Sequence, residues 1–474
     1  MAVNLSSGEG LHYLFASPQD LSAFSKVTEF KWPPLLTILL AGLLRVFGNM
    51  TLSTGILIAG SFILMFLSIR SILNALFFSN YIKWALWILF LFNPILTDVF
   101  SVSDIFSLSV WISGFALFIR YVQTGNRPHL LFWSFILYLP AAIRYQYYPL
   151  VFIIPALFFL TAENSEKKQY RRTGLILFAG VALFLSIQIL ILKSTGGQGA
   201  YIADIVEWSP KNLERLYPFF INAFAPFYLL INKGIEANHL DVKTTYRFFG
   251  FISILLFVGF SVLAFGTRNN NLRVKKAFIF PIVFILIYLS ALSIMYREQN
   301  NGGATFTYVQ ESRYWGLMYL LLPILAALML KTTTVKRVFL VSAFILLLIP
   351  NVIRTGKLLL TEDDSALYSH KMAFKRALSA QIERDQLKKM RPVVIACFDR
   401  DFAMYNADIP YATLPLDSLF SQSQIHHSVP VWLYVITRDT ISETQAAWMA
   451  SNGMQETQRR ATKYRLFERK RAPL

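Results

Sequence analysis

Long apolar runs recur along the 474-residue chain, and they restrict its fold more than any other feature. A helix that crosses a bilayer needs about 20 mostly apolar residues, and somewhat fewer where the bilayer thins. Two shorter runs contain or follow prolines and are predicted to lie at the interface or to re-enter the membrane: 33–48 and 219–232. Ten segments qualify as spans: 51–70, 82–99, 104–123, 129–143, 146–162, 173–193, 246–266, 276–296, 313–331 and 337–354. The expected fold is mainly α, a polytopic membrane helix bundle of about ten spans plus juxtamembrane helices.

The positions of the basic residues predict how these spans are oriented. Lys and Arg cluster in the connections 163–172, 267–276 and 331–337. Basic residues near helix ends stay on the cytoplasmic side, so ten spans place the opening segment, the turn at 98–104 and the corner at Arg144 on the outer side. The net charge is +18, but because Lys and Arg cluster in short loops between apolar runs, no nucleic-acid partner is expected.

From about residue 355 the composition changes to that of a soluble domain. A charged helical stretch at 363–390 precedes predicted strands over RPVVIACFD, VPVWLYVITRD and KYRLFERK, and a short helix is predicted from near Ser442 to Asn452 and Gly453. Three domains are therefore expected: an outer loop with a juxtamembrane helix at 1–50, a transmembrane bundle at 51–354, and a small extracytoplasmic α/β domain at 355–474.

Five acids fall on the predicted outer face, before or between the early spans: Glu9, Asp20, Glu29, Asp98 and Asp104. A carboxylate there can act as general base on an acceptor, or hold a divalent metal against a phosphate. It can equally cap a helix or lie in a solvated loop. Asp104 suits the N-cap of a helix over 105–123, and Asp20 precedes a short predicted helical stretch. Glu9 has no evident capping role.

Arginines at the predicted outer boundaries form a second group of candidates. Arg144 lies in AAIRYQYYPL beside three tyrosines, one of them Tyr147. Arg297 ends one predicted span and Arg313 opens another. Arginine can bind a phosphate bidentately while aromatic rings stack on a sugar. The alternative is that these arginines snorkel from helix ends without any function.

Other signals for ligands or cofactors are weaker. In the opening segment, Lys31 is a further candidate phosphate ligand, and His12 can serve as an acid–base group or a metal ligand. The single cysteine, Cys397, excludes an internal disulfide, and no Cys/His cluster has zinc-site spacing. The glycine-rich STGGQGAY lacks the Lys-Ser/Thr of a nucleotide-binding loop, so no soluble nucleotide site is expected. A divalent metal stays open as a cofactor.

Five stretches, taken in order, resemble the GT-C superfamily of membrane glycosyltransferases, which includes the protein O-mannosyltransferases and the lipid A aminoarabinose transferases. They cover most of residues 6–330 and read GEGLHYL, FKWPPLLTILLAGLLRVFG, NPILTDVFSVSDIFSLSVW, LYLPAAIRYQYYPLVFIIP and ESRYWGLMYLLLP. The resemblance implies a polyprenyl-phosphate or polyprenyl-diphosphate sugar as donor. It also implies an active site between juxtamembrane helices and the outer ends of the spans.

Carried over by position, the resemblance makes Glu9 the catalytic carboxylate and Asp104 the second acid of the outer turn. It makes Arg144 and Arg313 ligands of the lipid-linked phosphate. Members of the family more often have Asp where Glu9 stands, and they usually have a helix ahead of the first outer loop, whereas this sequence begins inside that loop.

The expected function is transfer of a sugar from a polyprenyl-phosphate carrier to a glycan, lipid or protein acceptor. The expected place is the outer face of a bacterial cytoplasmic membrane. Two alternatives are a lipid-linked sugar transporter or flippase, and a non-catalytic membrane scaffold. Carriers usually place ionisable groups at mid-membrane and often show repeated halves. Acids are absent from the centres of the predicted spans, although Arg45 and Arg120 lie in or near apolar runs.

Overall fold

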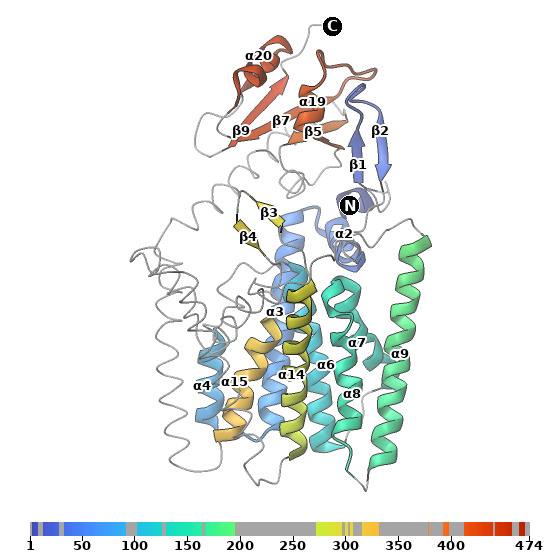
Figure 1. Cartoon of the computed structure of the whole chain (residues 1–474), viewed down its shortest axis with the longest axis vertical. Coiled ribbons are helices and arrows are strands. Elements are labelled where there is room, and N and C mark those ends of the chain that lie inside the picture. Colours follow the sequence, from blue (N-terminus) through green and yellow to red (C-terminus); the bar gives the residue numbers. More distant parts are fainter. Residues whose placement is uncertain are drawn as a thin grey trace.

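A computed structural model shows a helix bundle with a β-sheet beyond one of its ends (Figure 1). The described residues are 2–7, 13–27, 33–91, 102–125, 129–163, 166–194, 272–295, 299–301, 304–306, 315–330, 378, 392–397, 412–438, 441–456 and 464–469. Among them, four helices are long and apolar enough to cross a membrane: α3 (Met50–Ala75), α6 (Val102–Thr124), α9 (Lys167–Ser194) and α14 (Leu272–Met295). The prediction of a polytopic helix bundle is confirmed, whereas the count of ten spans is not.

Shorter apolar helices complete the described part of the bundle. The predicted spans at 129–143 and 313–331 correspond to α7 (Leu130–Ile143) and α15 (Gly316–Leu330). The predicted span at 146–162 is broken into η1 (Tyr145–Tyr147), η2 (Leu150–Phe152) and α8 (Ile153–Leu160), and the span at 82–99 begins as α4 (Asn80–Leu91). The apolar runs 219–232, 246–266 and 337–354 lie outside the described residues.

The run predicted at the membrane interface forms α2 (Leu35–Phe47), a helix of 13 residues. Pro34 is its N-cap residue, where a missing N–H costs no intrahelical hydrogen bond. Gly48 ends it in the left-handed conformation, with φ of 66°. A helix this short does not span the hydrocarbon core upright, which agrees with the predicted interfacial position.

The core of the bundle is aromatic and centres on α6. Phe158 packs edge to face against two other buried rings, with centroids 5.0 Å from Phe118 and 5.5 Å from Trp133. In its most apolar window α6 is 72% buried, against 28% for α9. The helix α6 is therefore the central element against which the others pack.

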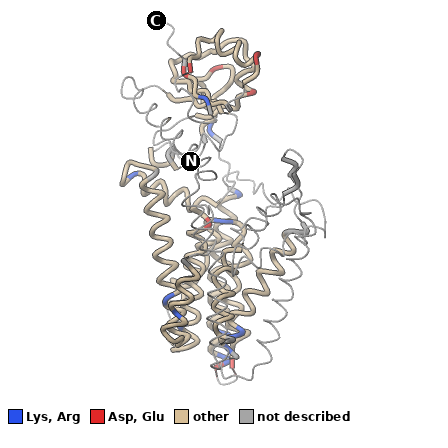
Figure 2. Tube along the Cα trace, turned by 90° about the vertical axis from the view of Figure 1, so that its left-hand side faces the viewer, with Lys and Arg blue, Asp and Glu red and all other residues tan. Residues whose placement is uncertain are grey.

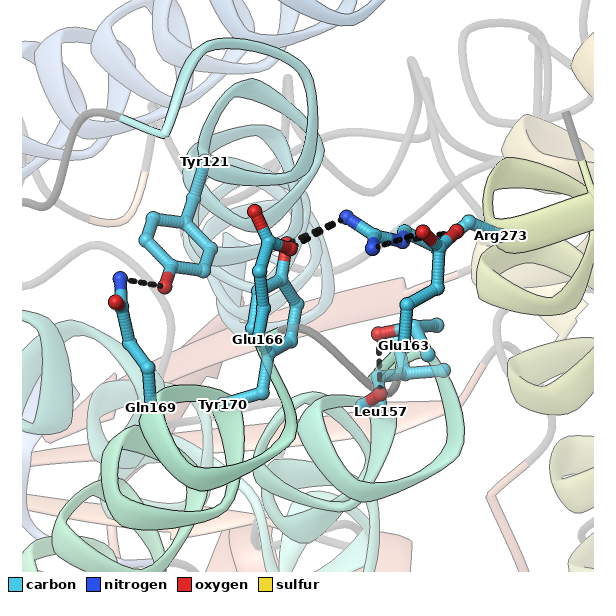
Figure 3. A network of polar contacts seen from close by, with 8 residues as sticks. Tyr121, Leu157, Glu163, Glu166, Gln169, Tyr170 and Arg273 are labelled. Carbon is cyan, nitrogen blue, oxygen red and sulfur yellow. Dashed lines mark hydrogen bonds and ion pairs between the residues drawn. The ribbon is translucent and has the colours of Figure 1, made fainter.

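A polar network joins three helices near the C-terminal end of α6 (Figure 3). The guanidinium of Arg273 forms ion pairs with Glu163 at 2.7 Å and Glu166 at 2.9 Å, and it also donates to the Tyr170 hydroxyl at 3.3 Å. Gln169 donates to the Tyr121 hydroxyl at 3.1 Å. The connections 163–172 and 267–276 were both predicted, from their basic residues, to lie on the cytoplasmic side. Residues of the two connections are in direct contact. We call this end of the bundle the basic end; charged residues gather there in Figure 2.

In the described part of the chain, the sheet beyond the other end has seven strands in the order β2-β1-β6-β5-β7-β9-β8. The parallel centre consists of β5 (Val393–Cys397), β6 (Ala412–Pro415) and β7 (Trp432–Arg438), followed by antiparallel β9 (Tyr464–Arg469) and β8 (Met454–Glu456). The predicted strands β5, β7 and β9 are present. So is the predicted helix α20 (Glu443–Ser451), whose N-cap Ser442 forms a capping box with Gln445. A short helix, α19 (Leu416–Phe420), and the strands β6 and β8 were not predicted.

The opening segment supplies the remaining two strands of this sheet. β1 (Tyr13–Ala16) pairs antiparallel with β2 (Phe24–Val27) and parallel with β6, Leu14 lying opposite Ala412. Leu14 shares an apolar core with residues of the C-terminal strands. The prediction of a short helical stretch after Asp20 is wrong, because a turn and strand β2 follow instead. Ahead of the hairpin lies α1 (Ala2–Ser6), and a separate two-stranded sheet pairs β3 (Gln299–Asn301) with β4 (Ala304–Phe306).

Candidate functional site

The candidate site is built around a break in the helices at residues 140–152, which we call the corner. Pro140 lies in the last turn of α7, and that helix ends at Ile143. Arg144 then takes an extended conformation, with φ of −141° and ψ of 130°, before two short 3-10 turns lead into α8. Proline removes an amide donor and restricts its neighbours, so Pro140 and Pro149 explain why one continuous helix does not form here.

One face of α6 binds this corner. Residues at helical spacing contact it in turn: Asp104 pairs with Arg144, the Ser107 hydroxyl donates to the Pro140 carbonyl at 3.5 Å, and the Trp111 indole donates to the Leu150 carbonyl at 3.0 Å. The Pro140 carbonyl also accepts from the Arg144 backbone N–H at 3.0 Å, so the Ser107 bond adds to a backbone hydrogen bond at the end of α7. The central helix therefore fixes the backbone on both sides of Arg144.

The ion pair between Arg144 and Asp104 is the chemical centre of the corner. Nη1 of Arg144 donates to Oδ1 of Asp104 and, at 3.2 Å, to the Ser103 hydroxyl. The two side chains are only 1% and 2% exposed. Either charge buried alone would destabilise the fold by roughly several kcal/mol. In the pair, each charge compensates for the lost hydration of the other. The carboxylate also lies in the first turn of α6, where the helix dipole favours a negative charge.

The interpretation of Asp104 as an N-cap is wrong. The helix begins at Val102, three residues before the start at 105 that a cap at Asp104 requires, and the carboxylate binds the arginine that follows α7. Snorkelling does not describe Arg144 either, because its side chain is buried rather than extended towards water. Tyr147 is buried beside the pair and interacts electrostatically with both charges. Three residues that the sequence singled out are thus brought together by the fold.

The pair and the Arg273 network lie at opposite ends of α6. Asp104 occupies the first turn of the helix, while Tyr121, which contacts the network through Gln169, lies near its end. Tyr121 lies seventeen positions after Asp104 in the same helix, a rise of about 25 Å. This is close to the thickness of a bilayer core, roughly 30 Å. The pair and the basic end therefore lie near opposite ends of one membrane-spanning helix.

The other predicted site residues lie outside the described part of the chain: Glu9, His12, Lys31, Arg297 and Arg313. Among the described residues, no group of three or more His, Cys, Asp or Glu is placed to bind a metal ion. Sequence reasoning missed Ser103, Ser107 and Trp111. For Ser107 and Trp111 the signal was the spacing from Asp104, since residues at 104, 107 and 111 recur about once per helical turn.

The described fold and site define a multi-pass membrane protein with a buried ion pair at one end of its bundle and a mixed sheet beyond it. No family model matches the chain, and no curated protein matches its sequence. Among solved structures it is similar to the crystal structure of ArnT from Cupriavidus metallidurans bound to undecaprenyl phosphate, with a TM-score of 0.47 and 10% identity over 99% of this chain and 92% of that one. No residue role is carried over from so distant a likeness.

Proposed function

We propose that this protein is a membrane glycosyltransferase that moves a sugar from a polyprenyl-phosphate carrier to an acceptor. The observation that carries the proposal is the buried Asp104–Arg144 pair at the corner, beside Tyr147 and far from the basic end. An ionisable pair buried in a helix bundle indicates a functional site by default. Its position in the first turn of α6, rather than at mid-span, favours a site at the membrane boundary over a carrier pathway.

Arg144 is proposed to bind the phosphate of the donor. A guanidinium presents a planar set of N–H donors that matches phosphate oxygens. Asp104 pairs with this group and orients it inside an apolar bundle, so the site is prepared before the substrate arrives. Tyr147 and its neighbouring tyrosines offer ring faces for the sugar.

Glu9 is proposed as the general base, in line with the resemblance. It accepts the proton of the acceptor hydroxyl or amine while the acceptor attacks the anomeric carbon of the sugar. The bond between that carbon and the phosphate oxygen breaks, and the polyprenyl phosphate leaves with the bonding electrons. In this scheme Asp104 does not contact the substrate and acts by positioning Arg144. Arg313 is a further proposed ligand of the phosphate. Weaker proposed ligands of the donor are Arg297, Lys31 and His12.

The site and the sheet domain are proposed to face the outside of a bacterial cytoplasmic membrane. The support is the Arg273 network, which joins two basic connections at the other end of the bundle. Basic connections of this kind mark the cytoplasmic side. A polyprenyl-linked donor needs no soluble nucleotide there.

The test is sugar transfer by the purified protein in lipid nanodiscs, with a panel of polyprenyl-phosphate sugars and with or without a chelator. We expect transfer by the wild type and a loss of about a hundredfold or more in Arg144→Ala, because a leaving phosphate loses its charge partner. Glu9→Gln should lose activity to a similar degree. Arg273→Ala, which removes an arginine at the basic end, is the matched control and should retain transfer.

Full activity of both Glu9→Gln and Arg144→Ala would contradict the residue assignments. Movement of the donor across the bilayer with no transfer by the wild type would contradict the enzyme proposal and favour a transporter. If the wild type binds neither the donor nor the lipid carrier, the result would favour the scaffold alternative.

A further inference from the structure

Gln188 is a buried amide in the apolar helix α9. Its side chain is 6% exposed, and apolar residues precede and follow it in SIQILIL. A polar group inside a membrane helix is costly and needs either a partner or a use. The site described above gave Gln188 no role.

The Gln188 amide reaches both flanks of the corner. Its Nε2 donates to the Tyr148 hydroxyl at 2.9 Å and to the Ala141 carbonyl at 3.5 Å. Ala141 lies three residues before Arg144 and belongs to the last turn of α7, where carbonyl groups have no partner within the helix. Tyr148 lies four residues after Arg144 and stacks edge to face on Tyr145, with ring centroids 5.4 Å apart.

Two helices thus hold the residues around Arg144. From α6, Asp104 binds the guanidinium itself and Ser107 binds the Pro140 carbonyl. From α9, one side chain bridges the backbone before Arg144 and the tyrosine after it. We propose that Gln188 is a positioning residue, which sets the place of Arg144 and its tyrosines for the donor phosphate and sugar. This inference rests on the proposed function.

A role in packing alone does not explain an amide at this position. Its Oε1 is buried and has no hydrogen-bond partner among the described residues. An apolar side chain of the same size would fill the space without burying an unused acceptor. The position therefore has a use for the two N–H donors of Gln188, and both of them contact the corner.

The experiment measures binding of undecaprenyl phosphate to the full-length protein in nanodiscs, together with KM and kcat for the donor. Gln188→Met keeps the length of the side chain and removes both donated bonds. Tyr148→Phe removes a single hydroxyl and serves if Gln188→Met does not fold. We expect each to weaken undecaprenyl phosphate binding and raise KM by roughly three- to tenfold, the range of one or two hydrogen bonds, with a smaller change in kcat.

The chain offers a matched control on the same helix. Gln169 also donates to a tyrosine hydroxyl, that of Tyr121 at 3.1 Å, but at the basic end. Gln169→Met should leave the binding and KM of the wild type unchanged. If Gln188→Met and Tyr148→Phe bind like the wild type while Arg144→Ala does not, the positioning role is refuted and the proposed function stands. If the wild type binds no undecaprenyl phosphate, both are refuted.

Discussion

Asp20 and Ser428 lie 408 positions apart in the chain, yet the Ser428 hydroxyl and backbone N–H both donate to the Asp20 carboxylate, at 2.7 and 3.1 Å. Ser22 donates to the same carboxylate through its hydroxyl at 2.6 Å and its backbone N–H at 2.9 Å. These bonds fasten the turn of the N-terminal hairpin to the C-terminal part of the sheet. The first and last segments of the chain therefore form one structural unit.

The Asp20 contacts predict a pH dependence of this unit. Hydrogen bonds from Ser22, then from Ser428, hold the pKa of Asp20 well below its ordinary value of 3.8. Because the folded-state pKa is depressed, the stabilisation is complete above that ordinary value and is lost as the pH falls below it. We expect hydrogen exchange in the hairpin, corrected for intrinsic rates, to speed up in the wild type below pH of about 4. Asp20→Asn should flatten this dependence. The same pH profile in both proteins would contradict it.

A disulfide should connect the two segments. The hydroxyl oxygens of Ser22 and Ser428 are 2.7 Å apart, so the two side chains already point at one another, as those of bridged cysteines must. The double variant Ser22→Cys with Ser428→Cys is expected to oxidise spontaneously if this domain is outside the cytoplasm. The native Cys397 is buried, so it competes little for disulfide formation with the two introduced cysteines. After proteolysis, a non-reducing gel should keep the N-terminal fragment joined to the C-terminal one, which neither single variant should do.

The Asp104–Arg144 pair should have separable effects on stability and activity. Arg144→Met alone leaves a buried carboxylate, and we expect a loss of about 3–5 kcal/mol in thermal or denaturant unfolding in detergent. Adding Asp104→Leu removes the stranded charge and should recover much of that stability. Transfer activity should stay lost in the double variant, since the phosphate ligand is gone. Recovered activity would show that the pair is only structural.

Close approach of α7 and α9 predicts an unusual effect of alanine at Gly180. Glycine to alanine within a helix normally stabilises by about 1 kcal/mol. A Cβ at Gly180 would lie 2.7 Å from Cβ of Ser134, an atom that the α7 backbone holds in place. We expect Gly180→Ala to destabilise by about 1–3 kcal/mol. Gly60→Ala is the control, because its Cβ would meet nothing within 4 Å, and it should be neutral or stabilising.

Several parts of the fold could be predicted because their signals are local. The strand β5, the helix α20 with its Ser442 cap, and the short helix α2 after two prolines all follow from neighbouring residues. The strand β1 could not, because four residues have little strand signal of their own. It is a strand because β6, almost 400 residues away in sequence, offers it a parallel edge and a shared core.

The sequence by itself determined that this is a membrane helix bundle with basic connections at one end, because apolar length and loop charge act through the bilayer rather than through tertiary contacts. It also marked Asp104, Arg144 and Tyr147 as unusual. Only the tertiary structure decided that the first two form a buried pair, that Gln188 bridges the flanks of Arg144, and that the two ends of the chain share a sheet. The reason is physical: a charge in an apolar surrounding is stabilised by its partner in space, and sequence spacing does not specify that partner across helices.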